Sequence, residues 1–136
     1  MATAKRFEEL EVWQRARNLT GLVYKVSNQG EFARDFGLRD QMRRAAVSIL
    51  SNIAEGFESR TQTMFIEYLG RAKGSAGELR AQFYVALDCG YLNQDDFASL
   101  VSEAEICSKQ LSAFIHYLNA QPKSLRASEE GAEYGV

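Results

Sequence analysis

Residues 45–57 read A-A-V-S-I-L-S-N-I-A-E-G-F, and this stretch, with the two turns before it, decides the fold. Apolar side chains recur along it at three- and four-residue steps, at Leu38, Met42, Ala45, Ile49 and Ile53. Residues at this spacing lie on one side of an α-helix. The pattern therefore predicts a long amphipathic helix over about residues 38–56.

A second face of the same helix is polar and consists of Gln41, Arg44, Ser48, Ser51 and Glu55. A helix face exposed to water is usually covered by long charged side chains such as Lys and Glu, whereas several side chains on this face are small. Small polar side chains suggest that the face meets another surface at close range. We expect Ser48, Ser51, Asn52 and Glu55 to form a hydrogen-bonded network at a helix or subunit interface, because buried polar groups need partners. A ligand or catalytic cleft is the alternative interpretation.

Three further apolar seams predict three further helices. The first begins near residues 8–11 and stops at residues 28–30, and the third follows a capping box at Ser59–Gln62 and ends at Gly90. The fourth begins at Asn93, a residue that caps helices well, and is closed by Pro122. The third seam is the clearest and consists of Phe65, Leu69, Ala72, Ala76, Leu79, Phe83 and Ala86.

Four amphipathic helices with short connectors predict an all-α fold, an antiparallel up-down-up-down four-helix bundle. The bundle is expected to occupy residues 1–121 of the 136, as one domain, with Phe32 and Phe36 packed down in a connector. Residues 122–136 contain three Glu and few large apolar side chains, which predicts a disordered acidic C-terminal tail.

The chain carries few residues suited to catalysis. His116 is the single histidine, and no Glu-x-x-His pair of the kind used in di-metal bundles is present. We therefore expect no catalytic residue, metal or cofactor, and predict that the protein is not an enzyme. Cys89 and Cys107 are expected to be reduced core residues of a cytoplasmic protein, and no apolar run approaches the length of a membrane span.

Glycines interrupt the surface of the third helix at Gly70, Gly74 and Gly77. A phosphate-binding loop would need a strand before the glycines and a Gly-Lys-Ser/Thr ending, and both are missing. Each glycine costs a helix about 1 kcal/mol relative to alanine. The glycines therefore predict close packing against another helix.

Several apolar residues lie off the seams of the first three helices, namely Trp13, Leu22, Val47, Leu50, Met64, Ile66 and Tyr84. Exposed together, they would form a patch too large for a soluble monomer. We therefore predict a homo-oligomer that buries them between subunits.

Basic residues are concentrated in the first part of the chain. The net charge is −2, but residues 1–80 carry 13 Lys and Arg against 10 Asp and Glu. Arg39, Arg43 and Arg44, with Arg15 and Arg17 on the first helix, are candidates for contact with nucleic-acid phosphates. The alternative is a solvated face, or ion pairs with residues such as Asp40. Tyrosines and Trp13 are expected in core or interface positions; an exposed ring beside an arginine would be the exception.

Three segments carry a resemblance to a known family: F-E-E-L-E-V-W-Q-R-A at residues 7–16, F-G-L-R-D-Q-M-R-R-A-A-V-S-I-L-S-N-I-A-E-G at 36–56 and E-Y-L-G-R-A-K-G-S-A-G-E-L at 67–79. The chain resembles the bacterial four-helix-bundle family associated with intervening sequences in 23S ribosomal RNA genes, which is related to the accessory variability protein of diversity-generating retroelements. The resemblance implies a ring-like homopentamer and no known catalytic activity. For the retroelement relative it implies a basic surface that contacts nucleic acid and a reverse transcriptase.

The sequence thus favours a non-enzymatic oligomeric binding protein, an accessory module for RNA or DNA backbones. The alternative is a protein-interaction scaffold without nucleic-acid binding.

Overall fold

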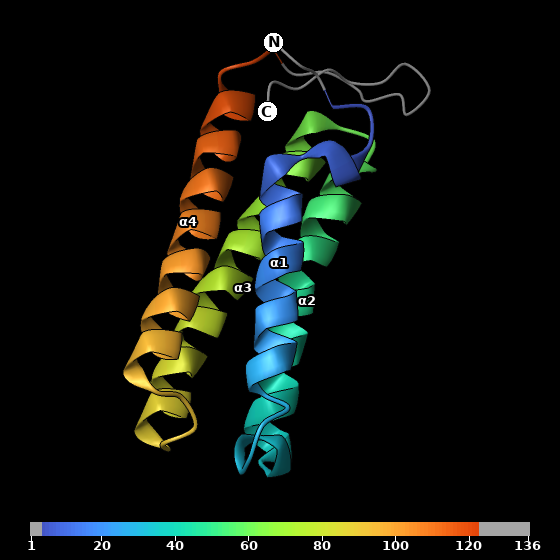
Figure 1. The fold of residues 1–136 in the computed structure, drawn as a ribbon. Helices are drawn as coiled ribbons and strands as arrows, with labels where there is room; N and C mark the ends of the chain where they lie inside the picture. The colour runs from blue at the N-terminus through green and yellow to red at the C-terminus, as the bar shows by residue number, and fades with distance from the viewer. Residues whose placement is uncertain (1–3, 123–136) are drawn as a thin grey trace.

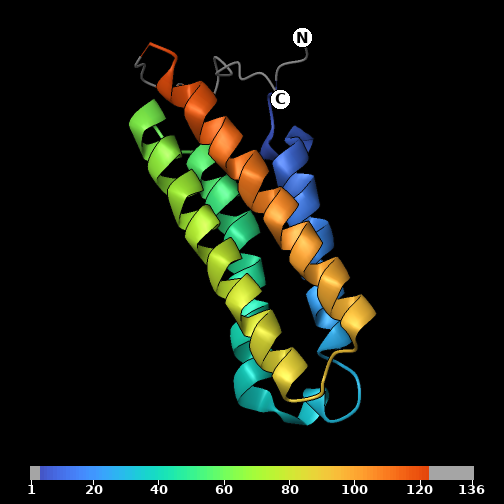
Figure 2. The ribbon, with the colours of Figure 1, turned by 90° about the vertical axis from the view of Figure 1, so that its left-hand side faces the viewer.

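A computed structural model describes residues 4–122, which form four α-helices and no strand. The helices are α1 (Glu11–Val26), α2 (Phe36–Phe57), α3 (Gln62–Asp88) and α4 (Gln94–Asn119). Short 3-10 helices at Phe7–Glu9 and Phe32–Arg34 precede α1 and α2. Successive helices run in opposite directions and lie side by side (Figures 1 and 2), so the predicted all-helical fold is confirmed. Of the predicted tail, residues 122–136, all but Pro122 lie outside the described residues.

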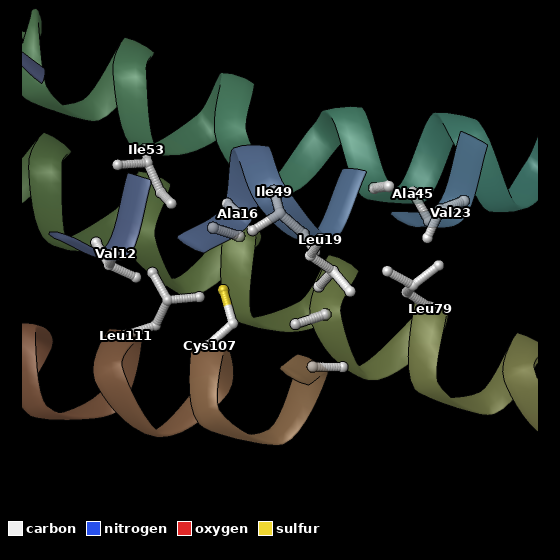
Figure 3. Close-up of a cluster of buried hydrophobic side chains, with 14 of the residues drawn as sticks. Val12, Ala16, Leu19, Val23, Ala45, Ile49, Ile53, Leu79, Cys107 and Leu111 are labelled. Atoms are coloured by element: carbon white, nitrogen blue, oxygen red, sulfur yellow. The ribbon is translucent and has the colours of Figure 1, made fainter. Parts of the chain in front are cut away.

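The core runs along the axis between the four helices, and every helix contributes to it (Figure 3). All seven residues predicted for the third seam are at most 1% exposed. Burying a Leu, Ile or Phe side chain stabilises the folded state by about 1.5–3 kcal/mol, so this seam is a major source of stability. In α4 the buried residues are Leu100, Ala104, Cys107, Leu111 and Leu118, whereas Phe97 and Phe114 are half-buried against the core.

Helices α2 and α3 make the most extensive contact in the bundle, and α1 and α4 the least extensive of the neighbouring pairs. Gly56, near the end of α2, is buried against α3. A Cβ atom at this position would lie 2.8 Å from both a ring atom of Phe65 and the Cβ of Tyr68. The absence of a side chain at Gly56 therefore lets the two helices approach closely where the α2–α3 connector begins.

Side chains cap three of the four helices. The Asn93 side chain accepts a hydrogen bond from the Asp96 backbone N–H at 2.7 Å, as its sequence predicts. The predicted capping box at Ser59 is wrong, because Thr61 caps α3 by accepting from the Met64 N–H. The side chain of Gln62 does not reach back to a cap. It is buried and donates from Nε2 to the Leu118 carbonyl of α4 at 2.6 Å.

The lower end of the bundle in Figure 1 is held by contacts between two connectors. Phe32 is buried as predicted, and its ring stacks on Tyr91 with centroids 4.9 Å apart. The Tyr91 hydroxyl donates to Asp35 Oδ2 at 2.9 Å, and this hydrogen bond raises the pKa of Tyr91 above its usual value. The other Asp35 oxygen accepts from the Leu38 N–H and caps α2. These contacts fix the start of α2, the helix that carries three of the candidate arginines.

One prediction about a cysteine is wrong, and the packing predicted at three glycines is absent within the single chain. A Cβ atom at Gly70, Gly74 or Gly77 would meet nothing within 4 Å, so no other part of the described chain packs against them. They lie on the outer side of α3, opposite its buried seam. Cys107 is buried as expected, but Cys89 is exposed because it follows the last residue of α3 and lies at the end of the bundle.

No helix within residues 4–122 combines the length and the apolar character needed to cross a membrane.

Gly56→Ala is expected to lower the free energy of unfolding by about 1–3 kcal/mol, the usual cost of overpacking a core. Its new methyl group would press on Phe65 and on the Cβ of Tyr68, which cannot move without the α3 backbone. Gly21→Ala is the control, because Gly21 lies inside α1 with open space around it. This change should raise stability by up to about 1 kcal/mol. Urea unfolding measures both, and equal effects of the two changes would contradict the close α2–α3 contact.

The two thiols should react at very different rates at pH 8. Burial raises the pKa of Cys107 to about 11, so its thiol stays protonated and shielded, whereas Cys89 is exposed. We expect the native protein to react quickly with one equivalent of maleimide, and the Cys89→Ser variant to lose this fast reaction. A second equivalent should react only after the protein is unfolded. In the unfolded chain the Cys107 thiol has its ordinary pKa of 9.0, so it ionises at lower pH than the buried thiol does. The free energy of unfolding should therefore fall as the pH rises from 9 to 11. Two fast thiols would contradict the buried position of Cys107.

Candidate nucleic-acid interface

Arg43 lies on the side of α2 that faces α1 and is held there by two contacts. Its Nε donates to the Ser27 hydroxyl at 2.9 Å, and Ser27 is itself fully buried just after α1. Its guanidinium carbon lies 4.5 Å from the centroid of the Tyr24 ring of α1. Neither Nη atom has a partner among the described residues. The fold therefore orients Arg43 while leaving two nitrogen donors available to an anion.

Arg39 is one turn before Arg43 on the same side of α2. Its Nη1 donates to the Ala33 carbonyl at 2.9 Å and its Nε lies 3.0 Å from a carboxylate oxygen of Asp40. Its guanidinium also lies over the Phe36 ring, 4.7 Å from the centroid. Arg39 thus supports the start of α2, and Asp40 offsets part of its charge, as the alternative interpretation anticipates.

The other three predicted arginines divide between two sides of the bundle. Arg44 is exposed and has no partner among the described residues. Arg17 is also exposed and lies two turns before Tyr24, on the same side of α1. Arg15 is turned toward α4 instead, where its Nη1 pairs with Glu103 at 2.9 Å. Arg15 therefore does not belong with the other arginines, because it lies about 200° from Arg17 around the helix, a little over half a turn.

The surface formed by Arg17, Tyr24, Phe36, Arg39 and Arg43 is called the α1–α2 face below; the exposed Arg44, one turn before Ser48, borders it on the side of α2 nearer α3. Two of its residues were not predicted as site residues. Tyr24 is 43% exposed and Phe36 61% exposed, although both were expected to pack inside or at an interface. Phe36 begins α2 rather than lying in the connector, which turns its ring outward. These two rings are the exception anticipated above, exposed aromatics beside arginines.

The predicted polar network exists in part, on the opposite flank of α2. Ser48 Oγ lies 2.9 Å from Ser75 Oγ of α3, and Asn52 Nδ2 donates to the Ser48 carbonyl at 2.8 Å and hydroxyl at 3.0 Å. Ser51 is half-buried and Glu55 exposed, and neither takes part. The network holds α2 against α3, so Ser48 and Asn52 have a structural role.

The side chains of the α1–α2 face are guanidinium groups and aromatic rings. Guanidinium groups offer several N–H donors in a plane that suits phosphate oxygens, and the rings offer flat apolar surface. Within residues 4–122 no three His, Cys, Asp or Glu side chains are grouped so that they could hold a metal ion. His116 is exposed on α4, away from this face.

Comparison with known proteins places this fold in a family. The family model described as 23S rRNA-intervening sequence protein matches residues 8–113, most of the described bundle. No curated protein matches the chain.

Among solved structures, a similar fold occurs in a protein of unknown function from the S23 ribosomal protein family of Bacteroides thetaiotaomicron VPI-5482. That structure aligns with a TM-score of 0.71 and 20% identity over 76% of this chain and 97% of the other. At this identity the likeness concerns the fold alone, and the neighbour has no established activity. The match over residues 8–113 is what identifies the chain, which belongs to the 23S rRNA-intervening sequence protein family.

Proposed function

We propose that this protein is a non-enzymatic, oligomeric accessory module that binds the phosphate backbone of RNA or DNA. The observation that carries the proposal is the α1–α2 face with the bordering Arg44: Arg43 is held in place with two free donors, and Arg17 and Arg44 are exposed. Contacts from arginine to phosphate position a nucleic acid without reading its sequence. A partner protein such as a reverse transcriptase remains a prediction, and it comes only from the resemblance to the retroelement relative.

A single chain offers few phosphate contacts, so an oligomer would strengthen binding. The chain as a whole has a net charge of −2, and only a local basic face can attract nucleic acid. Repeating the α1–α2 face in a ring of identical subunits multiplies the phosphate contacts available to one long ligand. Linked sites bind far more tightly than separate ones when the ligand spans them.

The outer side of α3 supports self-association. Gly70, Gly74, Gly77, Ala81 and Tyr84 follow one another at steps of 4, 3, 4 and 3 residues, the spacing of a second helix-packing seam. Nothing in the described chain covers the three glycines. Tyr84 and the adjacent Val85 are 53% and 49% exposed. We propose that a second copy of the chain packs on this surface and that the assembly is the homopentamer that the resemblance implies.

A scaffold that binds a different protein is the alternative. The observation that favours it is the exposure of further apolar residues away from α3, including Leu22 of α1 and Ile106 of α4. Of the seven off-seam residues predicted to form a patch, Leu22, Val47, Met64 and Tyr84 are exposed, whereas Trp13, Leu50 and Ile66 pack partly against the core.

Light scattering should give a mass several times that of the 15.3 kDa chain, and five times for a pentamer. Tyr84→Arg should lower this mass, because a charged side chain in the proposed α3 contact would lose its water shell. Ile106→Arg is the control, since Ile106 is an exposed apolar residue on α4. A monomeric protein, or equal effects of the two changes, would contradict the proposed assembly.

Arg17→Gln, Arg43→Gln and Arg44→Gln combined should weaken binding to both RNA and DNA. The slope of log affinity against log salt should flatten by about 0.7–0.9 for each phosphate that a subunit no longer neutralises. Fluorescence anisotropy at about 50 and 200 mM salt measures this. The matched control is Arg71→Gln with Arg80→Gln, two arginines of α3 that are ion-paired with Glu67 and Glu105. Unchanged affinity and slope in the triple variant, with its fold intact by circular dichroism, would show the proposal to be wrong.

A further inference from the structure

The α1–α2 face carries two arginine–aromatic pairs whose rings are open to solvent. Arg43 lies over Tyr24 and Arg39 lies over Phe36, at 4.5 and 4.7 Å from the ring centroids. Each guanidinium covers one face of its ring, yet Tyr24 keeps 43% and Phe36 61% of its surface exposed. Exposed aromatic surface of this kind is available to another flat group.

Both pairs are pre-arranged by the fold. Arg43 is fixed by the buried Ser27 hydroxyl, and Arg39 by the Ala33 carbonyl and the Asp40 carboxylate. A ligand that uses these pairs therefore does not have to order the arginines first, which removes part of the entropic cost of binding.

The exposed rings suit unpaired bases. Tyr24 belongs to α1 and Phe36 to α2, and each keeps a large part of its surface open to solvent. Bases in one strand of a duplex follow each other at about 3.4 Å and cover each other's faces. Paired bases therefore present edges and backbone to a protein, whereas unpaired bases can separate and stack on aromatic side chains.

We propose that the ligand of the α1–α2 face is single-stranded nucleic acid, with unpaired bases stacked on Tyr24 and Phe36 and phosphates on Arg43 and the bordering Arg44. This inference rests on the proposed function and narrows it. Arginine contacts alone would hold a duplex as well as a single strand. The two rings give the face its preference for the single strand.

The alternative occupant of the rings is protein, either a second copy of this chain or another polypeptide. A protein contact would use Tyr24 and Phe36 as apolar anchors and would leave nucleic-acid affinity unaffected by their removal. The two cases therefore differ in what the same substitutions do.

The test uses the full-length protein, freed of nucleic acid, and two probes. The first is an oligouridylate of about 16 nucleotides and the second a duplex RNA of similar length. Tyr24→Leu and Phe36→Leu should each weaken oligouridylate binding about 5- to 150-fold, the usual effect of removing one stacking ring. Duplex affinity should stay within about 2-fold, since phosphate contacts remain. Tyr24→Phe should bind the oligouridylate like the native protein, because the ring is kept.

The matched control is Tyr68→Leu, a half-buried tyrosine of α3 whose ring also has an arginine beside it, Arg71 at 5.1 Å from the centroid, and which lies outside both the α1–α2 face and the proposed α3 contact. It should leave the affinity for both probes unchanged. Circular dichroism and light scattering on every variant separate an effect on stacking from an effect on fold or assembly.

Three outcomes would overturn the inference, in distinguishable ways. Equal affinity for single strand and duplex, with no effect of the ring substitutions, would refute stacking while the arginine substitutions could still support backbone binding. A change of mass in Tyr24→Leu or Phe36→Leu without a change in oligouridylate affinity would assign the rings to a contact between copies. No binding of either probe at about 50 mM salt would refute the proposed function itself.

Discussion

Burial of one apolar stripe from each of four helices is the constraint on which the rest of this structure depends. The stripe on α3 is almost completely buried, and it fixes the rotation of that helix about its own axis. Once a helix is fixed in this way, every other residue on it has a determined direction. Arg43 is turned to α1, Ser48 to α3 and Gly74 to the outside because the core holds Ala45, Ile49 and Ala76 inside. The surface chemistry of the bundle is thus a consequence of its packing.

The fold was predictable because its signal is local. Each helix repeats an apolar residue every three or four positions, and that period requires no knowledge of the other helices. Residues at helix ends were predicted less well. The predicted cap at Ser59 is wrong because the choice between neighbouring caps depends on where the next element lies. The predicted burial of Cys89 is wrong for the same reason, since exposure at the end of a bundle also depends on the neighbouring elements. The outward direction of the three glycines of α3 could not be predicted from the sequence, because it is decided by the whole bundle.

The candidate site was predictable only as a set of arginines. The spacing of Arg39 and Arg43 placed them on one side of α2, but nothing in the sequence relates Arg43 to Tyr24 and Ser27, which lie on another helix and a turn. The position of Arg15 beside α4 could not be predicted either, because its partner Glu103 is 88 residues away. By contrast, Phe36 and Arg39 are three residues apart. Had the sequence placed the start of the helix at Phe36, their spacing would have predicted the contact between them. Sequence spacing therefore finds pairs within one helix, whereas pairs between helices need the tertiary arrangement.

The buried amide of Gln62 has a consequence for how the bundle comes apart. The last carbonyls of a helix lack hydrogen-bond donors within that helix. Gln62, the first residue of α3, donates from its side-chain amide to the carbonyl of Leu118, and by a longer hydrogen bond to the carbonyl of Gln121. Fraying of the last turn of α4 would leave this donor buried and unpaired, which typically costs about 1–3 kcal/mol. The end of α4 and the start of α3 should therefore open together as one cooperative unit. Backbone amide protons in the last turn of α4 should be better protected from hydrogen exchange than those of a helix end that has no such partner.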